Sequence, residues 1–433
     1  MRLIIISLDA VFAADAEFLL SLPALGKMAQ EGVFCDRVQT IYPSLTYPIH
    51  ASIVTGCYPE LHGIVHNQPF QPETEPTRRT WYWDASDIKV ETLFDQAHAA
   101  GRECAALLWP TTVLARHIKY NFPEILALPG ENQALKILRY GSARWLLTSE
   151  LRYGKRRVSY HQPHLDDYIT LIAGSLIQRH YVPTSKLGKR EDIIPSKRRQ
   201  ARHMPDALAL HLVDCDTTRH RHGTFSDEAK QALIRLDERV GRLMGELDRR
   251  DLLKDTIVAV VSDHGQADIT ASLPLDAWLQ ANKVPARAQS LGFGAYIHLH
   301  RGDYLPVLDV LRKHQKELHI QHVYTREELR ALRMTPDLML AVEAEEGLVY
   351  VDKEEEVGSL ATHGFGPRHP GSQALLWLSG PQFVSGMRLE KCNIVDIAPT
   401  LAAAAGLILP RAQGRVLQEI LLWDHVAKRS DEQ

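Results

Sequence analysis

The stretch Leu3-Ile4-Ile5-Ile6-Ser7-Leu8-Asp9 places a carboxylate directly after a short apolar run. A run of this kind is typical of a parallel strand that is covered on both faces of its sheet. Two later segments repeat the arrangement, namely Ala207–Val213 before Asp214 and Asp216, and Thr256–Val261 before Asp263. Because ligands gather where parallel strands end, we expect these acidic strand ends to converge at one edge of a sheet.

Predicted helices alternate with these strands. One spans Phe18–Glu31 and stops at Gly32, and a second spans Val90–Ala100 before an apolar run at Cys104–Leu108. Apolar side chains three and four residues apart mark a further helix, at Ala229, Leu233, Leu236, Val240, Leu243 and Leu247. The alternation predicts an α/β fold, with a doubly wound, mostly parallel sheet sandwiched by helices.

Two stretches interrupt this rhythm, and both are expected to be insertions that cap the site. They cover residues 121–203 and 273–355. The predicted core therefore consists of residues 1–120, 204–272 and 356–420, and residues 421–433 form a C-terminal tail.

The composition is that of an ordinary globular protein, with 45% hydrophobic and 24% charged residues and a net charge of -3. Nothing in this balance favours a nucleic-acid or membrane partner, and it leaves the oligomeric state open. The 5 cysteines are scattered without a CxxC pair, which argues against a disulfide framework. The N-terminal apolar run is too short for a signal segment, and no run approaches transmembrane length. We therefore expect a cytoplasmic protein.

Five polar segments carry the chemistry of the chain. They contain Asp9, the hydroxyl-bearing stretch Pro43–His50, Asp216 to His220, Asp263-His264, and His363. Asp216 and His220 are four residues apart, so one helical turn puts both side chains on the same side. Three Asp, three His and a hydroxyl form the ligand set of a two-metal phosphoryl-transfer site with a covalent nucleophile. Oxygen and nitrogen ligands of this kind suit zinc, with manganese as the alternative.

Each segment alone also has an ordinary structural interpretation. Asp9 is placed where a helix cap is common, and Asp263-His264-Gly265 fits a plain turn. His220 and His222 are close in sequence, and either could be an ordinary exposed histidine. His363 taken alone is weaker evidence still, as is His369 nearby. Their joint occurrence in this order is what favours the metal site.

Residues 42–67, YPSLTYPIHASIVTGCYPELHGIVHN, resemble the type I phosphodiesterase/nucleotide pyrophosphatase family of the alkaline phosphatase superfamily. The resemblance continues in Asp216–Gly223, Ser262-Asp263-His264-Gly265, Thr362-His363-Gly364 and Ile394–Leu401. It thus covers residues 1 to about 420, with weak matching in the two insertions. It implies an alkaline-phosphatase-like core.

The family resemblance also implies a role for each matching residue. Thr46 is the expected nucleophile, forming a covalent phospho-threonine, and Asn67 is expected to hydrogen-bond a phosphoryl oxygen. Two divalent metal ions are implied. One is expected at Asp9, Thr46, Asp263 and His264, and the other at Asp216, His220 and His363.

Several nearby residues compete with these assignments or depart from the family pattern. Ser44 and Thr55 are rival hydroxyls, although Thr46 fits the pattern. Cys57 is interpreted as a packing residue, because it lies outside the matched nucleophile position even though sulfatases of the superfamily use a modified cysteine. Arg219 stands where the family usually has glycine, and Gln266 stands where an apolar residue is common.

The expected function is hydrolysis of a phosphodiester or phosphoanhydride in a small phosphorylated substrate, with a nucleotide as a candidate. Tyr47 and the cluster Trp81-Tyr82-Trp83 would stack on a nucleobase or, alternatively, pack in the core. A phosphomonoesterase, a phosphonate hydrolase and a phosphotransferase are alternatives within the superfamily. A non-catalytic binding protein is the alternative from another class.

Overall fold

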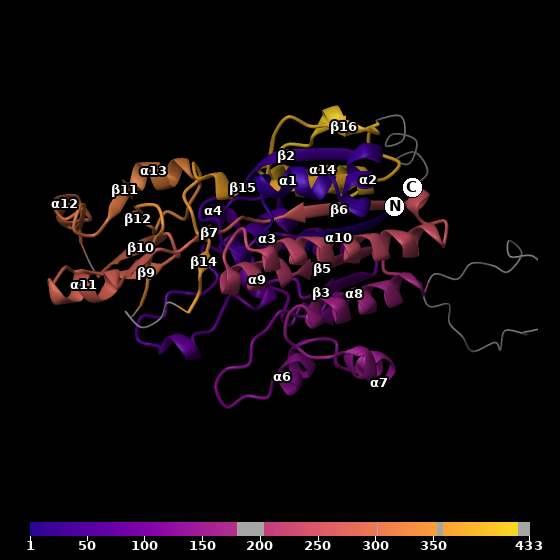
Figure 1. Cartoon of the computed structure of the whole chain (residues 1–433), viewed down its shortest axis with the longest axis horizontal. Coiled ribbons are helices and arrows are strands. Elements are labelled where there is room, and N and C mark those ends of the chain that lie inside the picture. The colour runs from indigo at the N-terminus through magenta and orange to yellow at the C-terminus, as the bar shows by residue number, and fades with distance from the viewer. Residues whose placement is uncertain (180–202, 301, 353–357, 423–433) are drawn as a thin grey trace, which may run out of the picture.

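The computed structural model describes residues 1–179, 203–300, 302–352 and 358–422 (Figure 1). Its main sheet has 9 strands in the order β16-β2-β15-β6-β1-β5-β3-β4, with β17 paired to β2. In chain order the strands are β1 (Arg2–Leu8), β2 (Val33–Gln39), β3 (Cys104–Leu107), β4 (Ile118–Phe122), β5 (Ala207–Leu212), β6 (Thr256–Ser262), β15 (Gln373–Ser379), β16 (Met387–Arg388) and β17 (Cys392–Asn393).

The centre of this sheet is parallel and in register at the site edge. β1 lies between β5 and β6 and is parallel to both, so that Leu8 pairs with Leu212 on one side and Ser262 on the other. β15 is antiparallel to β6 and β2, which makes the sheet mixed. Asp9 and Asp263, the residues that follow the paired Leu8 and Ser262, therefore emerge side by side, as the sequence predicts.

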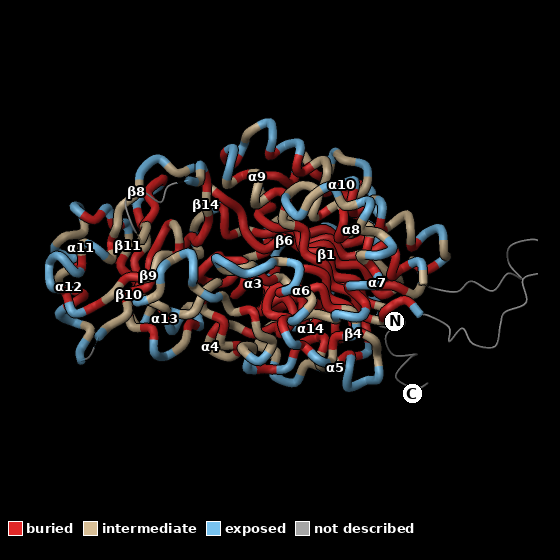
Figure 2. Tube along the Cα trace, turned by 90° about the horizontal axis from the view of Figure 1, so that it is seen from below, coloured by how far each residue is buried: buried red, intermediate tan, exposed pale blue. Residues whose placement is uncertain are grey.

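Helices cover both faces of the sheet, and the alternation of side chains along β1 shows why. Ile4 and Ile6 pack on one face and Leu3 and Ile5 on the other, each in its own hydrophobic core. The first core takes residues from α1 (Ala16–Leu20), α2 (Pro23–Glu31), α8 (His164–Ile177) and α10 (Asp227–Asp248). The second takes residues from α3 (Thr46–Thr55), α5 (Leu93–Ala99) and α14 (Ile397–Ala405). Figure 2 shows the buried residues concentrated around β1 and β6. The predicted sandwiched α/β fold is confirmed.

A second sheet of 4 strands stands at one end of the long axis (Figure 1). Its order is β11-β12-β10-β9, from Ile320–Tyr324, Leu340–Ala344, Gly294–Leu299 and Ala286–Ser290. The remaining strands are β7 (Ala267–Asp268), β8 (Ala271–Leu273), β13 (Leu348–Tyr350) and β14 (Ala361–Thr362). The remaining α-helices are α4 (Pro59–His62), α6 (Gln133–Tyr140), α7 (Ala143–Tyr153), α9 (Asp214–His222), α11 (Leu275–Ala281), α12 (Leu305–Lys313) and α13 (Arg326–Ala331).

The four-stranded sheet falls within the predicted insertion 273–355, and α6 to α8 fall within 121–203. Where core and insertions divide stays a prediction. Residues 180–202 of the first insertion and 423–433 of the tail lie outside the described residues. Within the described chain, no helix is long and apolar enough to cross a membrane.

Two predicted helix boundaries are wrong, for local reasons. The single helix expected over Phe18–Glu31 is two helices, because Pro23 lacks an amide proton and restricts Leu22 to an extended conformation. The helix expected from Val90 begins only at Leu93, because Thr92 and Asp95 form a capping box there.

Candidate active site

Four elements bring the predicted ligands together. Asp9 follows β1 and Asp263-His264 follow β6, while Asp216 and His220 lie on α9 directly after β5. Among the described residues, three sets of side chains lie close enough to share a metal, and one of them, His50, His211 and Asp263, contains no predicted ligand besides Asp263. We call Asp9, Asp263 and His264 the strand-end group, and Asp216, His220 and His363 the helix–loop group, since His363 lies in the loop after β14.

In the strand-end group, one oxygen of each carboxylate contacts a nitrogen of the protein within 3.1 Å, and the other oxygen has no hydrogen-bond partner. Asp263 Oδ1 accepts from the amides of Ala10 at 3.1 Å and His264 at 2.8 Å, and Asp9 Oδ2 lies 3.0 Å from His211 Nε2. Asp9 Oδ1 and Asp263 Oδ2 are buried without a hydrogen-bond partner, 3.6 Å and 3.3 Å from His264 Nε2. Buried, unpartnered carboxylate oxygens are costly unless a cation binds them, so this group fits a metal ion.

The electrostatics of the strand-end group favour the same interpretation. Burial, together with the carboxylates of Asp263 and Asp216, raises the pKa of Asp9 well above its ordinary value. Burial also raises the pKa of Asp263 to about 6. Burial lowers the pKa of His264 to about 4, which keeps the imidazole neutral as a metal ligand requires. The group is thus short of positive charge.

In the helix–loop group, Asp216 Oδ1 faces both histidines. It lies 3.3 Å from His220 Nε2 and 4.0 Å from His363 Nε2. Burial would raise the pKa of Asp216, but His220, His363 and His264 hold it well below its ordinary value. Burial lowers the pKa of His363 to about 3. The two groups meet where the rings of His264 and His363 stack, with centroids 3.9 Å apart.

All three candidate histidines share one hydrogen-bonding pattern. Nδ1 of each faces a backbone carbonyl oxygen, at 3.3 Å for His264 to Gly265, 2.7 Å for His220 to Ala361 and 3.2 Å for His363 to Ser44. A carbonyl only accepts, so Nδ1 donates to it in each histidine, and Nε2 is the nitrogen left to bind a metal ion. Burial would lower the pKa of His220, but Asp216 raises it. The Nε2 atoms are also those nearest the carboxylates. This is the arrangement by which proteins orient histidine for metal binding.

Thr46 opens α3 beside the strand-end group, and its Oγ1 lies 3.1 Å from His264 Nε2. The rival hydroxyls are engaged elsewhere: Ser44 Oγ accepts from the Phe365 amide at 2.8 Å, and Thr55 Oγ1 donates to the Ala51 carbonyl at 2.7 Å. Cys57 is fully buried beyond the far end of α3, consistent with a packing residue.

Asn67 and Tyr47 are held against each other. Asn67 Oδ1 accepts from the backbone amide of Tyr47 at 3.0 Å, which leaves its NH2 group as the donor. The Tyr47 side chain is fully buried, with its hydroxyl 3.3 Å from Glu124 Oε1 and its ring edge-on to Trp81. Because no face of this ring is open, the placement argues against the predicted stacking of Tyr47 on a substrate. Trp83 is buried too, whereas Trp81 and Tyr82 are half-buried.

Sequence patterns missed a buried layer behind the strand-end group. His211 lies between Asp9 and Glu124, with Nδ1 3.2 Å from Glu124 Oε2. Burial would lower the pKa of His211, but its contacts with Asp9 and Glu124 raise it well above its ordinary value. His50 Nδ1 faces the Thr46 carbonyl at 2.8 Å. The one available signal was a histidine inside the apolar run of β5.

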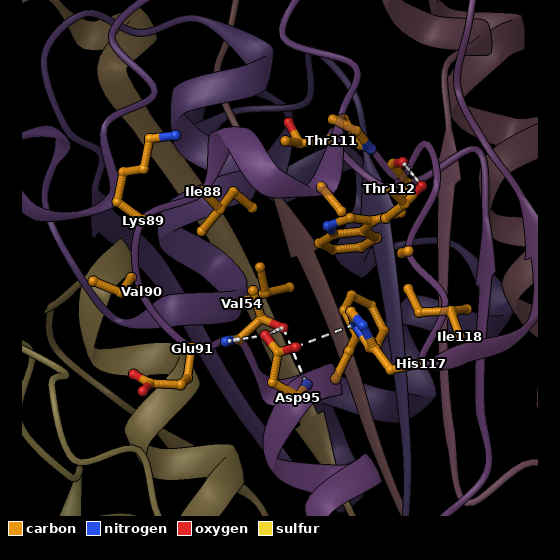
Figure 3. A pocket seen from close by; sticks show the side chains of 16 residues that line it. Val54, Ile88, Lys89, Val90, Glu91, Asp95, Thr111, Thr112, His117 and Ile118 are labelled. Carbon is orange, nitrogen blue, oxygen red and sulfur yellow. Dashed lines mark hydrogen bonds and ion pairs between the residues drawn. The ribbon is translucent and has the colours of Figure 1, made fainter. Parts of the chain in front are cut away.

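A separate pocket of about 330 Å³ lies at the other end of α3 (Figure 3). Val54, Ile88 and Val90 contribute apolar lining, and Asp95 and His117 form an ion pair at 3.4 Å across it. None of the predicted ligands lines this pocket. Here the ligand geometry, and not the size of a cavity, marks the candidate site.

Comparison with known proteins places this chain in a family. Residues 3–366 match the family described as type I phosphodiesterase / nucleotide pyrophosphatase. Bis(5'-adenosyl)-triphosphatase enpp4 of Xenopus laevis is 23% identical over 423 residues, which cover 94% of this chain and 78% of that protein. Ectonucleotide pyrophosphatase/phosphodiesterase family member 1 of Homo sapiens is 26% identical over 258 residues, 56% of this chain and 21% of that protein.

Solved structures agree on the fold. Murine ectonucleotide pyrophosphatase / phosphodiesterase 5 superposes with a TM-score of 0.69 at 20% identity, covering 97% of this chain and 100% of that one. An inactive threonine-to-alanine variant of the same murine protein, in complex with AMP, superposes with a TM-score of 0.70 at 19% identity and the same coverage. The chain therefore belongs to the type I phosphodiesterase/nucleotide pyrophosphatase family, a metal-dependent family of phosphoric ester hydrolases.

Proposed function

We propose that this chain hydrolyses a phosphodiester or phosphoanhydride bond of a nucleotide substrate, with Thr46 as nucleophile and a divalent metal ion in each ligand group. The shared orientation of the three histidines carries the proposal. Each presents Nε2 to a carboxylate while a backbone carbonyl fixes Nδ1. A structural ion-pair cluster has no need of this arrangement, whereas a metal site does.

The strand-end group would hold one ion together with Thr46 Oγ1, and the helix–loop group would hold the other. When bound, such ions lower the pKa of a coordinated hydroxyl and neutralise charge on a phosphoryl group. The mixed nitrogen and oxygen donors suit zinc, with manganese as the alternative.

Thr46 would carry out the covalent step, and the 3.1 Å between its Oγ1 and His264 Nε2 supports this role. Its Oγ1 would lose its proton to solvent and form a bond to phosphorus as the bond from phosphorus to the leaving oxygen breaks, giving a phospho-threonine and a leaving oxygen that takes up a proton from solvent. Water would then attack the same phosphorus and release Thr46 as a hydroxyl again. Thr46 is the first residue of α3, a ten-residue helix. The positive end of the α3 dipole therefore favours the negative phosphoryl group.

Asn67 would stabilise the charge that develops on the phosphoryl oxygens. Its side-chain oxygen is engaged with the Tyr47 amide, so its NH2 group is left to donate to a phosphoryl oxygen of the bound substrate. The hydrogen bond holds Asn67 against Tyr47, the residue that follows Thr46 in the sequence. It therefore limits how far Asn67 must move during the reaction.

The nucleotide assignment draws support from the relatives. One is a bis(5'-adenosyl)-triphosphatase, and one structural neighbour holds AMP. Trp81 is the half-buried aromatic side chain near Thr46 that would contact a base, since it packs on Tyr47. The expected cytoplasmic location stays a prediction, to be tested by cell fractionation.

The test pairs two threonines of α3. Thr46→Ala is expected to abolish hydrolysis while the protein keeps two metal ions, because Asp9, Asp263 and His264 remain. Thr55→Ala removes a matched hydroxyl at the other end of the helix and should stay active. Retained activity in Thr46→Ala would overturn the nucleophile assignment.

A substrate panel separates the proposed reaction from its alternatives. Chromogenic bis-esters and mono-esters of phosphate, nucleotide sugars and phosphonates are compared with zinc and with manganese. Preference for the bis-ester and for nucleotide sugars is expected. Faster release from the mono-ester or the phosphonate would assign a phosphomonoesterase or a phosphonate hydrolase instead, and transfer to an added alcohol would assign a phosphotransferase. Protein that binds no metal and turns over nothing would indicate a binding protein.

A further inference from the structure

Gln266, one of the two departures from the family pattern, bonds directly to a candidate metal ligand. Its side chain is 2% exposed, and its Nε2 donates to Asp216 Oδ1 at 2.5 Å and to the Asp216 carbonyl at 3.3 Å. Oδ1 is the oxygen that faces His220 and His363. A carboxylate oxygen has two lone pairs, so it can accept from Gln266 and still bind a cation. An apolar residue at position 266 cannot make this contact.

Arg219, the other departure, is buried as well. Its guanidinium donates to both oxygens of Asp15, at 2.6 Å and 3.0 Å, and to the carbonyl of Ala10. Ala10 in turn donates its amide to Asp263 Oδ1 at 3.1 Å. Ala10 also has a φ of 57°, a conformation that an L-residue keeps only when its surroundings hold it.

Gln266 and Arg219 each link one ligand group to the other. Gln266 reaches from the strand-end side to the helix–loop group, and Arg219 reaches from the helix–loop side to the strand-end group. Gln266 lies two residues after His264 of the strand-end group and bonds Asp216 of the helix–loop group. Arg219 lies on α9 between Asp216 and His220 of the helix–loop group, and reaches Ala10, which adjoins Asp9 and bonds Asp263. The two links therefore cross-brace α9 against the ends of β1 and β6.

We propose that Gln266 and Arg219 are positioning residues that set the spacing of the two ligand groups, and that Gln266 in addition orients the Asp216 carboxylate for its metal ion. The inference rests on the proposed two-metal site. Two-metal sites work at a separation of about 3.5–4 Å, so a small shift of α9 would spoil the clamp on the phosphoryl group. Partners of this kind contribute about 10- to 100-fold in metal affinity or activity.

Gln266→Met tests the proposal, because it keeps the length of the side chain and removes the donor. The wild-type protein is expected to bind two zinc ions per chain in a titration against a competing chelator. In Gln266→Met the ion of the helix–loop group should bind about 10- to 100-fold less tightly, with the ion of the strand-end group unchanged. The absorption spectrum of the cobalt-loaded protein should change for one site only. Gln321→Met, at an exposed position, is the matched control.

Arg219 needs a double variant, because removing it alone would leave Asp15 as a buried, unpaired charge. Arg219→Met combined with Asp15→Asn removes both charges. We expect kcat to fall about 10- to 100-fold with a smaller change in KM, since spacing matters most in the transition state. A purely structural role would lower the melting temperature and leave the kcat of the folded protein unchanged.

The outcomes separate this inference from the proposed function. Wild-type protein that binds fewer than two ions would refute the two-metal site itself. Two tight ions in the wild type with an unchanged zinc titration in Gln266→Met would overturn the inference and leave the two-metal site standing. Gln266→Leu is measured in parallel, so that a folding failure of one apolar variant leaves the other to decide.

Discussion

The strand-end group and the helix–loop group differ in how the fold holds them. The first consists of fully buried residues at the ends of β1 and β6, whose positions follow from the register of two adjacent parallel strands. The second takes two partly exposed residues from α9 and one buried residue from the loop after β14. One group is thus a property of the sheet, and the other depends on contacts between separate elements.

The contacts of the helix–loop group extend to the second sheet. His363 and Gly364 pack against Leu291 and Gly292, which lie just before β10 of that sheet. The His363 ring is held by the carbonyl of Ser44. A structural change in the second sheet should therefore disturb the helix–loop group more than the strand-end group. Variants of the two groups should accordingly have different effects.

The largest effect is expected from Asp263→Ala. It removes the acceptor of the Ala10 and His264 amides as well as a candidate ligand, next to the histidine that contacts Thr46. We expect no detectable hydrolysis and about one zinc ion per chain, since the helix–loop group stays complete, measured by elemental analysis of the purified protein. Activity close to that of wild type would show that the strand-end group is not the catalytic one.

Asp216→Ala should have a smaller and more selective effect. The strand-end group does not need this residue for its own hydrogen bonds, so we expect one zinc ion to remain and one to be lost. The rate of hydrolysis should fall by more than about 100-fold, which is the upper loss typical when a residue that only hydrogen-bonds a metal ligand is replaced. Loss of both ions would contradict the separation of the two groups.

Two glycines give a matched comparison of the groups. Gly364→Ala should weaken zinc binding at the helix–loop group. A Cβ at position 364 would lie 1.7 Å from the Leu291 carbonyl oxygen, and the residue has a φ of 96°. In Gly265→Ala the added Cβ would meet the ring of Phe12 at 2.4 Å, and a side chain can move more readily than backbone. Zinc titration should show the larger loss for Gly364→Ala, and an equal loss would indicate two equally rigid groups.

The smallest effect concerns acid, and it separates loss of metal from loss of fold. His62 lies outside both groups, and burial lowers its pKa from 6.5 to about 3. The unfolded chain then binds more protons than the folded one below pH 6.5, so stability is lost as the pH falls toward 3. We expect His62 to contribute about 2 kcal/mol of this loss between about pH 7.5 and about pH 5.

Urea unfolding of metal-free wild type and His62→Gln at both pH values measures this contribution. Glutamine can still accept from the Ile64 amide and donate to Ser52, the two bonds that His62 makes, but it does not titrate. The same pH dependence in both proteins would exclude His62 as a source of acid sensitivity.

That Asp9 and Asp263 lie together was predictable, because an apolar run ending in an acidic residue is a local pattern and adjacent parallel strands in register bring their ends together. Asp216 and His220 followed from helical spacing. His363 was counted among the polar segments, but its assignment to the group of Asp216 and His220 came only from the family resemblance, since nothing local links it to residues 9 or 216. The contacts of Gln266 and His211 and the burial of Tyr47 were not predictable, because they depend on which side chains packing brings together across the chain.

The order of strands in the main sheet has a consequence for synthesis of the chain. Among the described strands, β2 is hydrogen-bonded to β15, β16 and β17, and all three begin at residue 373 or later. During synthesis on the ribosome, β2 therefore cannot form its strand pairs until most of the polypeptide has been made. Until then the apolar side chains of Val33, Phe34 and Val38 stay exposed. Premature termination before residue 373 would yield a fragment prone to aggregation and not a smaller folded enzyme.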